Sequence, residues 1–179
     1  MLNDYSLEKP TIETEHLTIR PFSIHDIEDL QEWTPKKELY QYWGKGPSKL
    51  DLNPRLLFEK ENKPSKSFHL GIELNETKKV VGDLWIYLIE KNQIAKIAIR
   101  ISPFHHNKGI GTEAVKGIVD FCFTNTELKR IWSDVHIDNV SSCRMLEKSG
   151  FVKEGLIRQG KMVSTICDYY IYGIVKEDL

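Results

Sequence analysis

The sequence predicts an α+β protein of three layers, in which a mixed, mostly antiparallel sheet carries helices on both faces. Three observations support this prediction. Segments with a strand-like pattern of apolar residues follow one another at 67–75, 80–89 and 97–101. A long amphipathic run at 112–123 comes directly after the third of these strands. A second helix, 139–149, then lies between two further strands, so strands and helices are interleaved.

The first third of the sequence supplies one strand and two helices. Apolar residues alternate along 14–22, which predicts a strand. Ser23 begins a capping-box pattern, so a short helix follows and ends before Pro35. Residues 39–47 combine tyrosines and a tryptophan with glycines and predict an aromatic loop or a broken helix, and 52–62 predicts a second helix.

The last third repeats this alternation. A strand is predicted at 129–137, Asn139 is suited to cap the helix that follows, and Gly150 suits the left-handed position that ends it. Another strand follows the glycine, 158–164 is predicted to be a loop, and 168–175 is the closing strand. The predicted order is therefore β-α-α-β-β-β-α-β-α-β-β.

Length and composition indicate one domain at 10–179 after a polar tail at 1–9. Charged residues make up 28% of the chain and the formal net charge is −1, which gives no electrostatic reason to expect a nucleic acid or an anionic membrane as partner. The sequence shows neither a signal-peptide pattern nor an apolar run of membrane-spanning length. We therefore expect a cytoplasmic protein whose Cys122, Cys143 and Cys167 stay reduced.

A glycine-containing turn separates the strand 97–101 from the helix 112–123. Gly109 and Gly111 lie in this turn, beside Lys108. Backbone N–H groups at the start of a helix, where the helix dipole is positive, bind anions such as phosphate, and a lysine adds a full charge. The turn matches neither the P-loop nor the G-x-G-x-x-G dinucleotide pattern. An ordinary strand-to-helix turn with a solvated lysine is the alternative interpretation.

Three motifs, in this order and spacing, resemble the GCN5-related N-acetyltransferases, in the branch that acetylates ribosomal-protein N-termini. The first is E-x-L-x-I-R-P-F at 15–22, which is similar to the opening strand of that branch. The second is H-N-K-G-I-G at 106–111, similar to the acetyl-CoA signature of the superfamily. The third is N-x-x-S-x-x-M-L-E-K-S-G-F at 139–151. The resemblance covers residues 10–176, nearly the whole chain.

This resemblance implies the acyl-CoA N-acyltransferase fold, with splayed central strands, and acetyl-CoA as co-substrate without a metal. The strand 97–101 would pair with the pantetheine arm, and the turn would bind the diphosphate, where Gly109 and Gly111 keep side chains away from the phosphates. A strand amide near Ile99 or Ile101 would bind the thioester carbonyl. The implied coenzyme-binding residues are Ile99, Ile101, His106, Asn107, Lys108, Gly109, Ile110, Gly111, Thr112, Asn139 and Ser142.

Ser142 is the candidate acid for the coenzyme A thiolate, because the resemblance places it near the sulfur. Relatives carry a tyrosine four residues later, where this chain has Leu146. The base is left open, since relatives have a carboxylate where this chain has Lys96 or Lys161. An exposed serine and a packed histidine are the ordinary alternatives for Ser142 and His136. The candidate bases are Asp83, His136, Asp134 and Asp168, or a water relayed through one of them.

An acceptor pocket is expected from aromatic residues, namely Tyr40, Tyr42, Trp43 and Trp85. By resemblance, the protein acetylates a primary amine, chiefly a protein or peptide N-terminal amine such as that of a ribosomal protein. A small-molecule amine (amino sugar, polyamine or antibiotic) is the first alternative, although lysines around the aromatic loop disfavour polyamines. A non-catalytic acyl-CoA-binding module is the second. We expect a monomer or a homodimer.

Overall fold

The computed structural model describes residues 9–43, 45–60, 67–89 and 93–178. They form one eight-stranded sheet in the order β1-β2-β3-β4-β5-β6-β8-β7. The strands are β1 (Ile12–Glu13), β2 (Leu17–Arg20), β3 (Ser67–Leu74), β4 (Val80–Ile89), β5 (Ile94–Ile101), β6 (Arg130–His136), β7 (Val152–Met162) and β8 (Thr165–Val175). The helices are η1 (Ile24–Asp26), α1 (Ile27–Trp33), η2 (Lys37–Tyr40), α2 (Lys49–Leu52), α3 (Arg55–Lys60), η3 (Pro103–His105), α4 (Ile110–Asn125), α5 (Val140–Lys148) and η4 (Lys176–Asp178).

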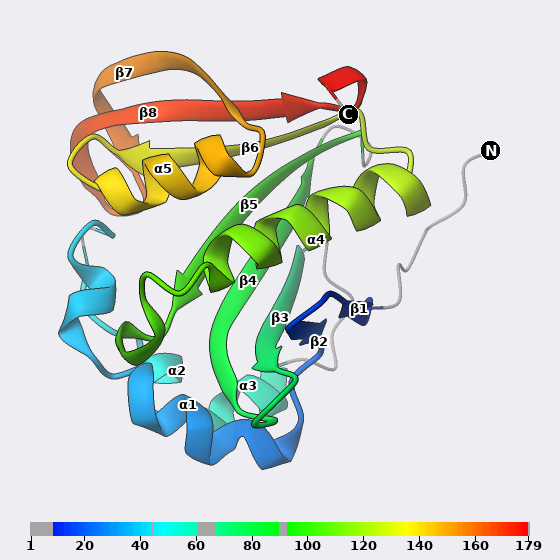
Figure 1. The fold of residues 1–179 in the computed structure, drawn as a ribbon. Coiled ribbons are helices and arrows are strands. Elements are labelled where there is room, and N and C mark those ends of the chain that lie inside the picture. The colour runs from blue at the N-terminus through cyan, green and yellow to red at the C-terminus, as the bar shows by residue number, and fades with distance from the viewer. Residues whose placement is uncertain (1–8, 44, 61–66, 90–92, 179) are drawn as a thin grey trace.

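The middle of the sheet contains its parallel pair, β5 and β6, whereas the other neighbouring strands are antiparallel. Parallel pairing extends from Ile94 with Arg130 to Lys96 with Trp132. Beyond this point the two strands separate (Figure 1), because β5 continues beside β4 while β6 continues beside β8. The mixed, mostly antiparallel sheet with splayed central strands is therefore confirmed.

Helices cover both faces of this sheet. α4 and α5 lie on one face (Figure 1), over the larger of two cores, in which Ile118 and Ile131 are fully buried. α1 packs against β4 through a smaller core that includes Leu30, Trp33 and Val80. Because successive side chains of a strand point to opposite faces, the even-numbered residues of β5 point away from the larger core. Within the described residues, no helix has the length and apolar character needed to cross a membrane.

The N-terminal half departs from the expected elements in two places. An additional short strand, β1, precedes the first one expected and pairs with β2. The helix expected at 52–62 is two short helices, α2 and α3, and its last two positions lie outside the described residues. Asn53 between them is non-helical, with φ −138° and ψ 84°, because the ring of Pro54 disfavours the helical conformation in the preceding residue.

The C-terminal half departs from expectation at 158–164, which was predicted to be a loop and is mostly strand. β7 continues through this segment to Met162, which pairs with Thr165, so only Val163 and Ser164 remain as the turn. Pairing with β8 overrides the weak strand propensity of this polar run. Of the tail expected at 1–9, only Lys9 lies within the described residues.

Candidate functional site

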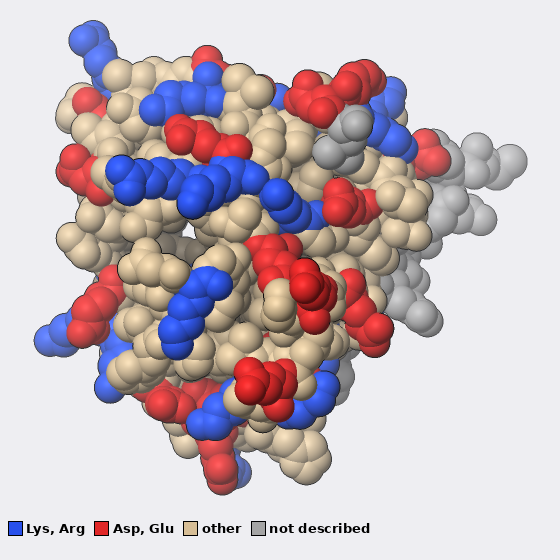
Figure 2. Space-filling view, viewed as in Figure 1, with Lys and Arg blue, Asp and Glu red and all other residues tan. Residues whose placement is uncertain are grey.

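A cavity of about 350 Å³ lies in the gap between β5 and β6. Its walls come from both faces of the sheet. Asn139 and Ser142 contribute from α5, whereas Tyr42 and Trp43 contribute from the segment after η2. Figure 2 shows an opening beside α5, with Lys and Arg side chains on either side of it. The site can therefore bring together two molecules that approach from different sides.

The backbone of β5 faces this gap at alternate residues. The carbonyl of Ile97 accepts a hydrogen bond of 3.0 Å from the Ser133 hydroxyl on β6. The carbonyl of Ile101 accepts one of 2.8 Å from His106 Nε2. Since alternate residues of a strand direct their N–H and C=O groups to the same side, the backbone groups of Ile99 also face the gap. An extended amide-containing ligand could pair with them as an added strand does.

The turn before α4 exposes backbone at the positive end of a 16-residue helix. Gly109 is the N-cap residue and has φ +81°, a left-handed conformation that favours glycine, and nothing lies within 4 Å of where its Cβ would be. Gly111 also has a packing role, because a Cβ there would lie 2.7 Å from Met145 Sδ. The second glycine therefore permits close packing of α4 on α5. Lys108 is exposed beside the turn.

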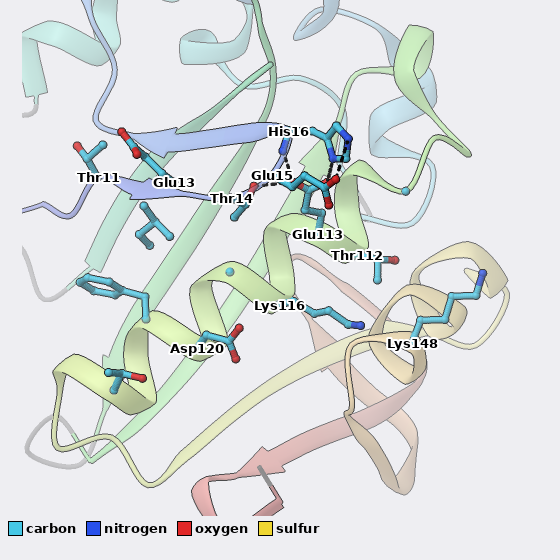
Figure 3. A pocket seen from close by; sticks show the side chains of 15 residues that line it. Thr11, Glu13, Thr14, Glu15, His16, Thr112, Glu113, Lys116, Asp120 and Lys148 are labelled. Carbon is cyan, nitrogen blue, oxygen red and sulfur yellow. Dashed lines mark hydrogen bonds and ion pairs between the residues drawn. The ribbon is translucent and has the colours of Figure 1, made fainter. Parts of the chain in front are cut away.

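A shallow groove of about 870 Å³ adjoins this turn, between the β1–β2 connection and α4. It is lined by Thr112 and Lys116 and by several carboxylates (Figure 3). Glu113, in the first turn of α4, accepts hydrogen bonds from the Thr14 hydroxyl at 2.6 Å and from the backbone N–H of His16 at 2.7 Å. These bonds hold the β1–β2 connection on the start of α4 and direct the Glu113 carboxylate toward that connection.

The N-terminus of α5 forms another wall of the cavity. The Asn139 side chain accepts a hydrogen bond of 3.2 Å from the backbone N–H of Ser142, which caps the helix. Both residues line the cavity and are half-buried. Leu146, at the position where relatives carry a tyrosine, is buried and also lines the cavity. The hydroxyl in this wall therefore belongs to Ser142.

An ion pair bridges β5 and β6 where their parallel pairing ends, from Lys96 in the last pair to Asp134 two residues beyond its partner Trp132. Lys96 Nζ lies 2.7 Å from Asp134 Oδ2, and the two side chains are 24% and 16% exposed. The ammonium group also lies 5.0 Å from the centre of the Trp132 ring. Both charged residues line the cavity.

His136 lies further along the same face of β6 and also lines the cavity. Its ring is tilted against that of Tyr42, with 5.4 Å between the ring centroids. Nδ1 accepts a hydrogen bond of 3.2 Å from the backbone N–H of Asp138, so the neutral ring carries its proton on Nε2. In that tautomer Nε2 donates, and the one free lone pair of the ring, on Nδ1, is already occupied by the backbone of Asp138.

The other two candidate bases lie away from the cavity lining. Asp83 is 1% exposed and is held by Arg100, whose Nε lies 2.9 Å from Oδ1, and by His69, whose Nε2 lies 3.0 Å from Oδ2. Burial alone would raise the pKa of Asp83, but Arg100 and His69 outweigh it and hold that pKa below its usual value. Asp168 accepts a hydrogen bond of 2.8 Å from the backbone of Gln159. Their geometry indicates structural roles.

The four aromatic residues expected around the acceptor divide into two groups. Tyr42 and Trp43 line the cavity. Trp85 lies behind them, stacked on His69 with a centroid distance of 4.2 Å and tilted against Trp43 at 5.8 Å. Tyr40 is 6% exposed and belongs to the smaller core, so its ring supports the pocket from behind.

Two features of the site were missed by the sequence interpretation. One is the pairing of Lys96 with Asp134, which depends on the parallel register of β5 and β6. The other is Arg100, a buried arginine within an otherwise apolar stretch of β5. A charged residue inside a buried strand was the available signal, because such a group requires a partner. Within the described ranges, no three His, Cys, Asp or Glu side chains converge to hold a metal ion.

Comparisons with known proteins agree with this geometry. The family model described as "Acetyltransferase (GNAT) domain" matches residues 16–152. The chain is 30% identical over 177 residues to the uncharacterized N-acetyltransferase YoaA of Bacillus subtilis (strain 168), covering 93% of this chain and 97% of that protein. It is 26% identical over 142 residues to spermidine N(1)-acetyltransferase of Vibrio cholerae, covering 78% and 80%.

Solved structures share the fold. An acetyltransferase of the GNAT family from Bacillus anthracis superposes with a TM-score of 0.83 at 24% identity, covering 94% of this chain and 99% of that one. The ribosomal-protein-S5-alanine acetyltransferase of Vibrio fischeri superposes with a TM-score of 0.78 at 19% identity, covering 94% and 98%. The fold of this chain is therefore shared with both of these proteins.

Proposed function

Because the chain belongs to the GNAT acetyltransferase family and is an N-acetyltransferase, we propose that its acceptor is a single primary amine, that of a protein or peptide N-terminus. The observation that carries this proposal is the ion pair between Lys96 and Asp134 in the cavity. The pair neutralises the carboxylate before any acceptor binds.

The donor, acetyl-CoA, fits the side of the cavity formed by β5, the turn and α5. Its pantetheine amides would pair with the backbone of β5 around Ile99, and its diphosphate would meet the N–H groups of the turn at Gly109. The exposed left-handed backbone at Gly109 supports this placement, since no side chain shields it. Asn139 and Ser142 would contact the inner end of the arm.

The reaction forms a bond between the acceptor nitrogen and the acetyl carbon and breaks the bond between that carbon and sulfur. The acceptor ammonium must first lose a proton, and the leaving thiolate must gain one. Of the candidate bases, Asp134 is a cavity-lining carboxylate, so we assign it to receive the proton, directly or through water. Lys96 disfavours a second cation beside it and so favours the neutral, nucleophilic amine. Ser142 is assigned as the proton donor to sulfur.

The charged residues of the cavity also indicate the class of acceptor. Among the described residues that line the cavity, Asp134 is the only carboxylate, and Lys45 adds a positive charge to that of Lys96. A polyamine or an aminoglycoside carries several ammonium groups and needs several carboxylates to pair with them. A peptide N-terminus presents one amine, and its first side chain can pack against Tyr42 and Trp43. The fold shared with a ribosomal-protein acetyltransferase is compatible with this choice.

A small-molecule amine is the second candidate, supported by the relative named for spermidine. The test is release of free thiol from acetyl-CoA with a panel of acceptors: lysine-free peptides that begin with Ser or Ala, the same peptides with a blocked N-terminus, spermidine, and an aminoglycoside. We expect turnover on the free peptides and none on the blocked ones. Faster turnover on spermidine or the aminoglycoside would exclude the peptide proposal. Thermal stabilisation by acetyl-CoA without any turnover would instead indicate a binding module.

A further inference from the structure

Arg100 occupies an unusual position in the middle of β5. Its side chain is only 5% exposed. One nitrogen, Nη1, donates to the Tyr40 hydroxyl at 2.9 Å and to Asp51 Oδ1 at 2.8 Å. The other side of the guanidinium donates to both oxygens of Asp83, at 2.9 and 2.5 Å. One cation therefore links the strands β4 and β5 to the helices η2 and α2. In the chain, η2 precedes and α2 follows the cavity-lining residues Tyr42 and Trp43.

Aromatic rings enclose the same guanidinium. Its central carbon lies 4.7 Å from the centre of the Trp85 ring and 5.7 Å from those of Trp33 and Trp43. These rings keep water away, which strengthens the charged hydrogen bonds of Arg100. Trp43 belongs to this enclosure and also lines the cavity, so the wall of the cavity is in contact with the Arg100 guanidinium.

Asp51 has two distinct functions, one for each carboxylate oxygen. Oδ1 accepts from Arg100, whereas Oδ2 accepts from the backbone N–H of Ser48 at 2.7 Å and from its hydroxyl at 2.6 Å. The bond from the Ser48 backbone N–H is one half of the capping box of α2, and the backbone N–H of Asp51 completes the box by donating to the Ser48 hydroxyl. The contact with Arg100 and the helix cap can therefore be separated by substitution.

We propose that Arg100 is a positioning residue that fixes the acceptor-binding residues 40–43 and 45–51 to the coenzyme-binding strand; this rests on the function proposed above. The backbone of Ile99 faces the coenzyme side of the gap, and the side chain of the next residue holds the segment that carries Tyr42 and Trp43. The strand that binds the donor thereby sets the distance to the wall that binds the acceptor. Arg100 itself acts through this segment and touches neither substrate.

The test is steady-state kinetics of Asp51→Asn in the full-length protein. We expect the KM for the peptide acceptor to rise about tenfold, the scale of one weakened charged hydrogen bond. The KM for acetyl-CoA should change less than twofold, because the β5 backbone and the turn are untouched. Asp51→Glu, which restores the charge, should recover part of the acceptor KM.

Ser48→Ala is the matched control, because it weakens the cap of α2 and leaves the contact between Asp51 and Arg100. An equal rise of the acceptor KM in Ser48→Ala, or a parallel rise of both KM values in Asp51→Asn, would overturn the positioning role of Arg100. Hydrogen exchange provides a readout that does not depend on turnover: amides of 45–51 should exchange faster in Asp51→Asn than in Ser48→Ala. If the wild-type protein acetylates no amine, the proposed function fails. The hydrogen-exchange comparison then decides by itself whether Arg100 holds this segment in place.

Discussion

At the scale of single residues, Gly109 shows how one backbone conformation supports the site. Its φ of +81° disfavours any residue with a Cβ, although the surrounding space is open. We expect Gly109→Ala to lower the free energy of unfolding by about 1–2 kcal/mol and to weaken acetyl-CoA binding several-fold, as measured by denaturant unfolding and by titration calorimetry. Gly155→Ala is the control, since Gly155 also has open space but lies in β7 without a positive φ. Equal effects of both substitutions would remove the special role of the turn.

Asp134 is the residue on which the proposed chemistry depends most. Asp134→Asn keeps the shape of the side chain but removes the charge that receives a proton. We expect kcat to fall by about 10²–10⁴ with little change in the affinity for acetyl-CoA. A kcat within threefold of the wild-type value would show that water alone deprotonates the amine.

The carboxylates around Arg100 predict a pH dependence of stability. Burial would raise the pKa of Asp51, but Arg100 and Ser48 outweigh it, and Asp51, like Asp83, has a folded-state pKa below the usual 3.8. A lowered folded-state pKa means that the stabilisation is complete above pH 3.8 and is lost as the pH falls through the folded-state value.

We therefore expect Asp51→Asn to lower the free energy of unfolding by about 1–3 kcal/mol at pH 7, and we expect that difference to shrink as the pH falls from 7 through the folded-state pKa of Asp51. Urea titrations of both proteins across this range measure it. A difference that stays constant at all pH values would mean that the charge of Asp51 contributes nothing.

At the scale of elements, α5 combines two roles at its first turn. Asn139 caps the helix and lines the cavity. Asn139→Ala should lower the free energy of unfolding by about 1 kcal/mol, whereas Asn139→Asp should keep the cap and the stability. Both should weaken acetyl-CoA binding if the side-chain amide donates to the coenzyme. Normal affinity in Asn139→Asp would restrict Asn139 to capping.

The elements also show which local patterns were decisive. The capping box at Ser23, the left-handed Gly150 and the alternation of β3 were visible in the sequence and formed as predicted. The break between α2 and α3 and the length of β7 were predicted wrongly. The local signal for the break was Pro54, whose ring disfavours the helical conformation at Asn53. β7 has exposed side chains along most of its length, so its strand character comes from pairing with β8.

At the scale of the whole molecule, the larger core protects groups that are reactive when exposed. Cys122 on α4 is 3% exposed, and burial raises the pKa of its thiol to about 12. Cys167 on β8 is half-buried. We expect a maleimide at pH 8 to label Cys167 first, and Cys122 only at the rate of global unfolding, as followed by mass spectrometry with Cys167→Ser as control. Rapid labelling of Cys122 in the folded protein would contradict the burial of its thiol in the larger core.

The sequence by itself determined the succession of elements from β3 to α5, the turn before α4 and the cap of α5 at Asn139, because each depends on chemistry within a few neighbouring residues. Only the tertiary structure decided which charges meet. Lys96 and Asp134 are 38 positions apart, and Arg100 is 49 positions from Asp51. Contacts over such distances depend on strand register and on where the chain crosses, and no local periodicity encodes them. The separation of β5 from β6 has the same origin, since each strand stays with its antiparallel neighbour and leaves the gap in which we propose that the acetyl group is transferred.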